Sequence, residues 1–191
     1  MARDPAIVTE YRKLFGSGCC TIVHTTERSV ADSAAFVKPI TAATGVWMMG
    51  GVPSTLSDVY WHTATERALR EVFERGGVVG GSSAGAVVQG SRVPTTHPDS
   101  GFAFLPNTFI MAHLNRNNAC DMLLKIVGET RGIVGIGISE KTAAIMTRDH
   151  IEVVGTGEVV IDDGRMRAGK QYVVLQPGER FDLASPLTRV P

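Results

Sequence analysis

The chain has 191 residues, of which 43% are hydrophobic and 20% are charged, values typical of one globular domain with a hydrophobic core. Nineteen Lys and Arg residues balance nineteen Asp and Glu residues without blocks of like charge, so neither nucleic acid nor a membrane surface is an expected partner. No apolar run approaches the ~20 residues of a membrane span, the N-terminus has no apolar signal core, and the cysteines lack disulfide or zinc spacing, so we expect a cytoplasmic chain without a metal.

The first half of the chain alternates predicted helices with short apolar strands. Asp4 and Pro5 are typical of a helix start, and Thr63 and Glu66 form a capping-box pattern before a later helix. The expected elements are, in order, a helix over 5–15, a strand over 20–24, a helix over 31–43 with a kink near Pro39, a strand over 46–49 and a helix from 63 to the glycine pair at 76–77. This alternation predicts parallel strands joined by helical crossovers.

Residues 78–89 have the composition of a sharp turn between a strand and a helix. The pattern Gly81-x-Ser83-x-Gly85 is typical of a nucleophile elbow, in which strained backbone presents one side chain and tolerates only small neighbours. Ser83 is therefore the candidate nucleophile, and a helix starting after it would direct backbone N–H groups toward a developing oxyanion. A Gly- and Ser-rich turn or a phosphate-binding loop has the same composition, so the pattern alone leaves these alternatives open.

The second half of the chain changes from alternating elements to strands alone. A surface loop over 91–106 precedes a strand over 108–111, then a helix that Asn115 can cap, and then a strand over 133–138. The strands expected after these are 143–147, 151–154, 158–161 and 172–175. We therefore expect a single domain over 1–191, with a parallel α/β core over 1–140 that carries the site and an antiparallel β-rich extension over 141–191.

Three segments, in the right order, resemble motifs of the serine peptidase family that contains cyanophycinase and aspartyl dipeptidase. Residues 81–86, Gly-Ser-Ser-Ala-Gly-Ala, resemble that family's Gly-Thr-Ser-Ala-Gly-Ala, and residues 45–51 resemble its strand ending in a Gly-Gly pair. Residues 135–143 resemble its Gly-Ile-Gly-Ile-Asp-Glu-x-Thr-Ala. The resemblance implies a three-layer αβα fold with a mostly parallel sheet, of the flavodoxin-like or class I glutamine-amidotransferase-like type. It also implies acyl transfer through a serine without a cofactor.

His113 is the candidate general base, because it follows a strand of the predicted parallel sheet about thirty residues after Ser83, as the base does in the resembled family. His97, in the loop over 91–106, is the weaker alternative. His24 is better explained as a polar residue at a strand end. A serine hydroxyl needs such a base within hydrogen-bond reach and a third group to orient that base.

Glu140 is the candidate for that third group, because cyanophycinase-like members carry a glutamate in the matching segment. Dipeptidase-like members take their acid from an earlier aspartate, for which Asp99 or Asp121 would be stand-ins. The expected oxyanion hole consists of the backbone N–H groups of Gly51 and Ala84. The candidate substrate-binding residues are Gly50, Ser82, Asn115 and Arg116.

Two departures from the family pattern bear on the substrate. Val52-Pro53 stands where cyanophycinase-like members have an Asp-Gln pair, and residues 114–120 lack their arginine-rich run, leaving Arg116 as the basic residue there. Both changes remove groups that could hold an acidic or β-linked aspartyl substrate.

The expected function is that of a serine hydrolase, a cyanophycinase-like peptidase acting on a small peptide or isopeptide. The alternatives are an esterase of the α/β-hydrolase fold, disfavoured by the chain order Ser-His-Glu, and a non-catalytic binding or assembly protein that kept the fold. The first strands of the resembled family are missing before the helix over 5–15. Because their loss would expose a sheet edge, we expect a homo-oligomer.

Overall fold

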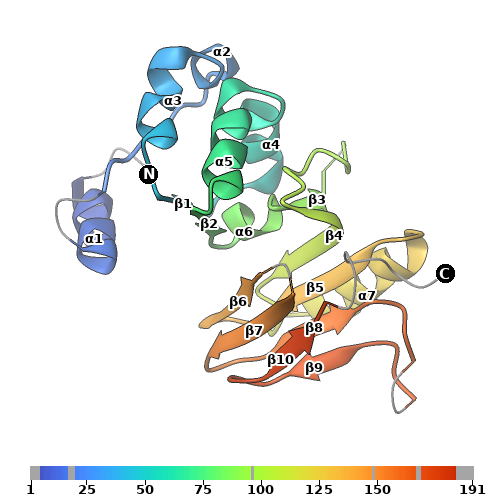
Figure 1. Ribbon diagram of the computed structural model, residues 1–191. Coiled ribbons are helices and arrows are strands. Elements are labelled where there is room, and N and C mark those ends of the chain that lie inside the picture. The colour runs from blue at the N-terminus through green and yellow to red at the C-terminus, as the bar shows by residue number, and fades with distance from the viewer. Residues whose placement is uncertain (1–4, 17–19, 96, 148, 167–168, 184–191) are drawn as a thin grey trace. The chain divides into compact units, whose positions relative to one another are not determined.

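The computed structural model describes residues 5–16, 20–95, 97–147, 149–166 and 169–183 (Figure 1). These residues form two compact units. The first unit consists of the chain up to Val46 together with Asp58–Val79, and the second consists of Trp47–Ser57 together with the chain from Gly80 onward. The elements that carry most of the first unit are α1 (Pro5–Phe15), α2 (Arg28–Ala31), α3 (Ala34–Thr41) and α5 (Ala64–Glu74). Helix α4 (Pro53–Tyr60) begins in the second unit and ends in the first.

Two predictions for the first unit are wrong in detail. Residues 20–24 form no strand, because this half-buried apolar run pairs with no neighbouring strand in the described part of the chain, and a strand exists only through such pairing. The helix expected over 31–43 is divided at Asp32 and Ser33 rather than kinked at Pro39, which lies inside α3. The break has a local cause, since the Ser33 hydroxyl accepts from the Phe36 N–H at 3.3 Å and so starts a new helix.

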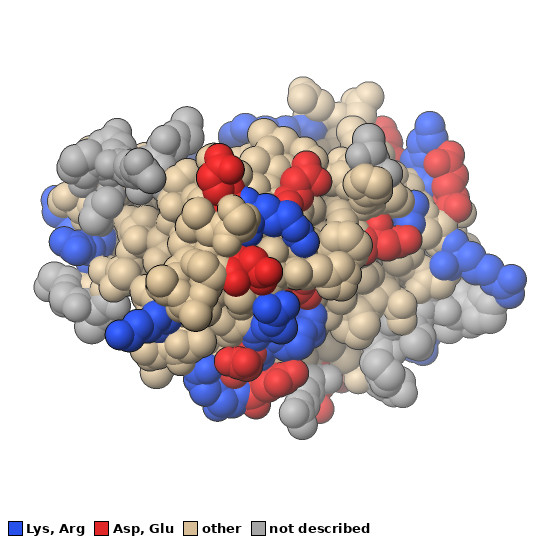
Figure 2. Space-filling model, turned by 90° about the horizontal axis from the view of Figure 1, so that it is seen from above, with Lys and Arg blue, Asp and Glu red and all other residues tan. Residues whose placement is uncertain are grey.

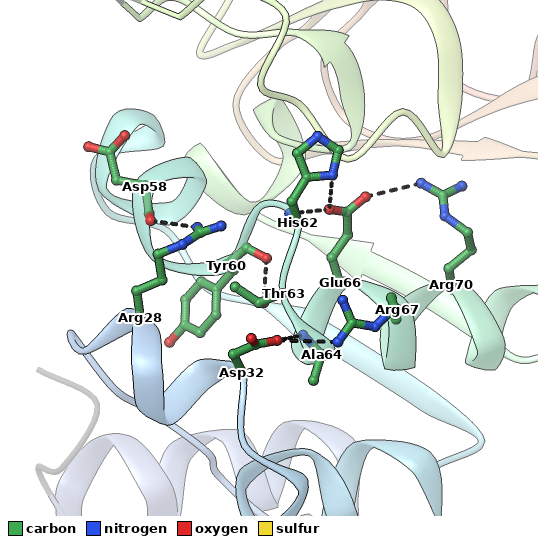
Figure 3. A network of polar contacts seen from close by, with 10 residues as sticks. All are labelled: Arg28, Asp32, Asp58, Tyr60, His62, Thr63, Ala64, Glu66, Arg67 and Arg70. Atoms are coloured by element: carbon green, nitrogen blue, oxygen red, sulfur yellow. Dashed lines mark hydrogen bonds and ion pairs between the residues drawn. The ribbon is translucent and has the colours of Figure 1, made fainter.

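Helix α5 starts as predicted, but through different contacts (Figure 3). The Thr63 hydroxyl donates to the Tyr60 carbonyl at 2.6 Å and does not cap the helix. The nearly buried carboxylate of Glu66 instead accepts from the His62 backbone N–H at 2.6 Å and from the Arg70 guanidinium at 3.3 Å. Asp32 supplies the other cap, because its carboxylate accepts from the Ala64 N–H at 2.6 Å. Two carboxylates thus satisfy backbone N–H groups at the start of one helix, where negative charge is also favoured.

The second unit is built on a five-stranded sheet with strand order β3-β4-β5-β8-β9. The bounds are β3 (Gly90–Arg92), β4 (Leu105–Ala112), β5 (Val134–Ile138), β8 (Val159–Asp162) and β9 (Val173–Leu175). The first three strands are parallel, and β8 and β9 continue the sheet antiparallel. A separate antiparallel sheet of order β10-β7-β6 consists of β6 (Thr142–Met146), β7 (His150–Gly155) and β10 (Arg180–Asp182).

Alternating side chains of the five-stranded sheet build two cores. On one face Phe109 and Val160 pack with Leu123 and Val127 of helix α7 (Ala119–Glu129). On the other face Ile110 and its neighbours pack against β7 of the second sheet, in a cluster of Ile110, Val134, Ile136, Ile151, Val153, Val159, Ile161 and Leu175. Helix α7 therefore covers one face and the small antiparallel sheet contributes to the core on the other.

The predicted fold class is confirmed: the protein is α/β, with a mainly parallel central sheet and additional antiparallel strands toward the C-terminus. Strand β10 was not predicted, and β8 and β9 extend the central sheet itself. Strands β1 (Gly45–Met48) and β2 (Val78–Gly81) form a further two-stranded sheet, and β2 leads into the short helix α6 (Ala84–Val87).

Candidate active site

Ser83 lies at the tip of a tight turn between β2 and α6. Its backbone has φ 51° and ψ −120°, a region that side-chain-bearing residues rarely adopt. A Cβ atom at Gly81 would lie 2.3 Å from the Gly85 carbonyl oxygen, and one at Gly85 would lie 2.1 Å from the Met48 carbonyl oxygen. Only glycine fits at both positions, so the Gly-x-Ser-x-Gly pattern has a steric cause here. The helix after the turn is shorter than the pattern suggested, with four residues.

His113 and Glu140 follow two neighbouring parallel strands at the same edge of the sheet. Strands β4 and β5 pair in register up to Ala112 and Ile138, and the Leu114 N–H donates to the Ile138 carbonyl at 3.0 Å just beyond them. The carboxyl ends of parallel strands are where such sheets gather functional side chains. The backbone of His113 is also left-handed, with φ 59°, so its ring is presented by a tight turn.

These two side chains and Ser83 form a continuous hydrogen-bonded chain. The Ser83 Oγ lies 2.8 Å from His113 Nε2, and His113 Nδ1 lies 2.6 Å from Glu140 Oε1. Because an ionised carboxylate only accepts, Nδ1–H donates to Glu140 and leaves Nε2 free to accept from the serine hydroxyl. The imidazole is thus held in the tautomer and position of a general base for Ser83.

The charge of Glu140 is maintained by its donors. Its pKa is lowered from the ordinary value of 4.5 chiefly by the hydrogen bond from His113; burial opposes this shift, and the positive charges of Arg116, His113 and Lys141 lower the pKa further. The His113 and Glu140 side chains are 41% and 31% exposed, so the pair is open to solvent and to a ligand. A carboxylate that stays ionised at neutral pH can stabilise an imidazolium.

The turn after β1 lies beside the nucleophile. A Cβ atom at Gly50 would lie 3.8 Å from Ser83 Oγ, and the Ser82 N–H donates to the Met48 carbonyl at 3.0 Å. The N–H of Ala84 opens helix α6, a position at which a helix provides no acceptor of its own. The glycine turn and the start of α6 therefore both lie beside Ser83.

The chain matches the model of one known protein family. The model of peptidase family S51 matches residues 1–154, a range that includes Ser83, His113 and Glu140. The chain belongs to this family. The resemblance inferred from the three sequence motifs is thereby confirmed.

Individual relatives of this S51 member are similar over most of its length. A cyanophycinase from Nostoc sp. (strain PCC 7120) is 28% identical over 85% of this chain and 60% of its own length. A cyanophycinase from Geminocystis herdmanii (strain PCC 6308) is 26% identical over 86% of this chain and 67% of its own length. The chain thus spans about three fifths to two thirds of these relatives. A crystal structure of a peptidase from an acI-B1 Actinobacterium matches with a TM-score of 0.70 and 24% identity, over 95% of this chain and 80% of that one, a likeness that shows the fold alone.

Two predicted substrate-binding residues of this S51 member contact Glu140. The Asn115 side-chain oxygen accepts from the Glu140 backbone N–H at 3.0 Å, and Arg116 Nε lies 2.6 Å from Glu140 Oε1. Asn115 does not cap α7, which begins at Ala119 after Asn118. No sequence signal marked these contacts, because they depend on how the turns after β4 and β5 meet.

The residues considered as an alternative base and an alternative acid make their contacts elsewhere. The His97 backbone N–H donates to the Thr95 hydroxyl, and the Asp99 carboxylate pairs with Arg92 at 3.1 Å. Both residues therefore belong to the loop after β3. Asp121 is in the first turn of α7. Within the described ranges, no group of three or more His, Cys, Asp or Glu residues is arranged to hold a metal ion, and no helix there is long and apolar enough to cross a membrane.

Proposed function

We propose that the protein is a serine hydrolase, a cyanophycinase-like serine peptidase that forms an acyl-enzyme on Ser83. The observation that carries the proposal is the hydrogen-bonded chain from Ser83 Oγ through His113 to Glu140, with links of 2.8 Å and 2.6 Å. Membership of peptidase family S51 agrees with it. In the proposal Ser83 is the nucleophile, His113 the general base and Glu140 the residue that orients it.

The proposed reaction proceeds in two steps. His113 Nε2 accepts the hydroxyl proton as Ser83 Oγ attacks the scissile carbonyl, and the N–H groups of Gly51 and Ala84 stabilise the oxyanion. The same imidazole then gives the proton to the leaving amine, which departs and leaves an ester on Ser83. Water, activated by His113, hydrolyses this ester and restores the serine. These reaction steps need no cofactor or metal ion.

We propose a small peptide or isopeptide as the substrate, held in part by Gly50 and Ser82 beside the nucleophile. Cyanophycinase is the name of both relatives, which supports this class. The immediate surroundings differ from the family pattern, since Val52, 59% exposed, follows the glycine turn where an acidic residue is expected. An apolar side chain there favours substrates without a charged group at that position. Comparing hydrolysis of α- and β-linked aspartyl dipeptides with that of dipeptides whose side chains are uncharged tests this point.

We also propose a homo-oligomer in the cytoplasm that binds neither nucleic acid nor membranes. Trp47, on strand β1, is 42% exposed, and a second copy that covered it would remove this large apolar side chain from water. On the face shown in Figure 2, basic and acidic side chains are interspersed, which argues against nucleic acid as a partner. Light scattering tests the oligomer, and a monomeric mass would contradict it.

Stoichiometric labelling with a fluorophosphonate, located by mass spectrometry, tests the central proposal. We expect the label on Ser83 of the full chain, no label at that position in Ser83→Ala, and a strong decrease in His113→Ala. Ser29→Ala, at an exposed position of α2, is the control and should label like the wild type. A folded wild type that does not react would favour a non-catalytic binding protein with this fold. Turnover of esters but not of peptides would favour an esterase.

A further inference from the structure

One oxygen atom of the Glu140 carboxylate has two close partners, a hydrogen bond from His113 and an ion pair with Arg116. His113 Nδ1 and Arg116 Nε each lie 2.6 Å from Oε1. Both partners come from the turn directly after β4, which the Arg116 backbone N–H closes by donating to the His113 carbonyl at 2.9 Å. The Asn115 side chain of the same turn accepts from the Glu140 backbone N–H. One four-residue turn therefore holds Glu140 by its backbone and by its carboxylate.

We propose that Arg116 is a positioning residue of the site, whose guanidinium holds the Glu140 carboxylate in the orientation that accepts from His113. The proposal deepens the proposed function and rests on it. It differs from the interpretation of Arg116 as a substrate-binding residue, because the guanidinium is already engaged in an ion pair with Glu140, with Nε 2.6 Å from Oε1.

The need for such a residue follows from the chemistry of the pair. A glutamate side chain has three rotatable bonds, and that of Glu140 is 31% exposed, so packing alone does not fix its carboxylate. A guanidinium is always protonated, so its attraction for the carboxylate 2.6 Å away persists at any working pH. The Arg116 side chain itself is 65% exposed, so its removal leaves no buried cavity.

The electrostatics of the carboxylate agree with this role. Among the described residues, the charged or titratable groups that act on Glu140 are His113, Arg116 and Lys141. The His113 hydrogen bond contributes most to lowering the pKa of Glu140, and the charge of Arg116 lowers that pKa further. Replacing Arg116 by a neutral residue should therefore move the Glu140 titration toward the ordinary range.

The test uses the full chain and a readout that does not depend on activity. Carboxyl ¹³C NMR follows the titration of Glu140, whose signal is assigned by its loss in Glu140→Gln. In Arg116→Gln, which keeps an N–H donor but no charge, we expect Glu140 to titrate at higher pH than in the wild type. Arg116→Lys, which keeps the charge, should remain near the wild type. Arg131→Gln, at an exposed position between α7 and β5, is the matched control and should not change the titration.

Two further measurements separate positioning from substrate binding and from a purely structural effect. Imidazole ¹⁵N shifts of neutral His113 should report Nδ1–H in the wild type and a mixture of tautomers in Arg116→Gln and Arg116→Ala. On a peptide substrate kcat should fall about 10- to 100-fold, the cost of a misplaced catalytic group, with KM little changed.

An unchanged Glu140 titration and an unchanged tautomer in Arg116→Gln would overturn the proposal, and so would a rise in KM without a fall in kcat. If the wild type carries no fluorophosphonate label, the proposed function fails. The two NMR measurements still decide whether Arg116 positions Glu140 in that case.

Discussion

The Ser83 Oγ lies 2.8 Å from His113 Nε2, although 30 residues separate the two in the chain. Both residues have left-handed backbone, with φ 51° and φ 59°. Each such conformation costs on the order of 1–3 kcal/mol and persists only where the surrounding structure imposes it. Here the glycines flanking Ser83 and the paired ends of β4 and β5 impose it. Two strained turns thus bring the hydroxyl and the imidazole together.

Replacing Glu140 by glutamine should impair the reaction far more than it impairs folding. Glutamine is nearly isosteric, but it cannot stabilise an imidazolium and can orient the ring in the wrong tautomer. We expect the rate of acylation to fall about 10³- to 10⁴-fold, as in related triads. The measurement is the rate of fluorophosphonate labelling or peptide hydrolysis. Glu129→Gln, at the exposed end of α7, should react like the wild type; equal losses in both variants would argue against a role for Glu140.

The stability contributed by Glu140 should depend on pH in an acidic window. Because His113, followed by Arg116 and Lys141, lowers the folded-state pKa of Glu140 below its ordinary value of 4.5, the ionised carboxylate stabilises the fold above that value. The contribution is lost as the pH falls through the lowered folded-state pKa. Urea unfolding from pH 7 to pH 3 should therefore show the wild type more stable than Glu140→Gln at neutral pH, with the difference disappearing in acid. A difference that stays constant over this range would show that the carboxylate charge is not responsible.

The parts of the site that follow local rules were predictable from the sequence. The elbow at Ser83 depends on small residues that the chain displays directly, and His113 and Glu140 come immediately after apolar runs that form parallel strands. The contact of Arg116 with Glu140 was not predictable, because it depends on the geometry of two turns after neighbouring strands. Asn115 shows the same limit, since an asparagine before a helix suits a cap as well as a long-range acceptor.

The fold shows a similar division between local and long-range information. Helices α1 and α5 were predictable from their apolar spacing. The Thr63 hydroxyl of the predicted capping box does not cap α5, and Asp4, the predicted cap of α1, lies outside the described residues. The absence of a strand over 20–24 and the addition of β8 and β9 to the central sheet depend on strand partners. A β-strand has the same alternating or apolar pattern whichever neighbour it pairs with, so the pattern specifies a strand but not its sheet.

Removing the Glu66 side chain should destabilise the first unit. In Glu66→Ala the His62 N–H loses its acceptor and Arg70 loses its ion pair (Figure 3). The bond from the His62 N–H to Glu66 is partly buried, and a typical intramolecular hydrogen bond contributes about 0.5–1.5 kcal/mol to stability. The free energy of unfolding, measured with urea, should fall by about this amount, whereas Glu71→Ala, exposed on the same helix, should change it little. Similar effects of the two changes would mean that the helix start is held by Asp32 alone.

Two glycine substitutions separate a steric requirement from a general effect on flexibility. In Gly85→Ala the new Cβ would lie 2.1 Å from the Met48 carbonyl oxygen, so the turn that presents Ser83 must open, and we expect a loss of about 3 kcal/mol or more. In Gly128→Ala the new Cβ meets no atom within 4 Å on helix α7, so the smaller entropy of the unfolded chain should stabilise the protein by about 0.4–1 kcal/mol. Thermal unfolding and Ser83 labelling of both variants check this pair.

Gly85→Ala should lose labelling together with stability, because the strained turn that opens is the one that holds the hydroxyl against His113. Wild-type labelling in Gly85→Ala would show that the elbow tolerates a methyl group and that its glycine is not required for the presentation of Ser83.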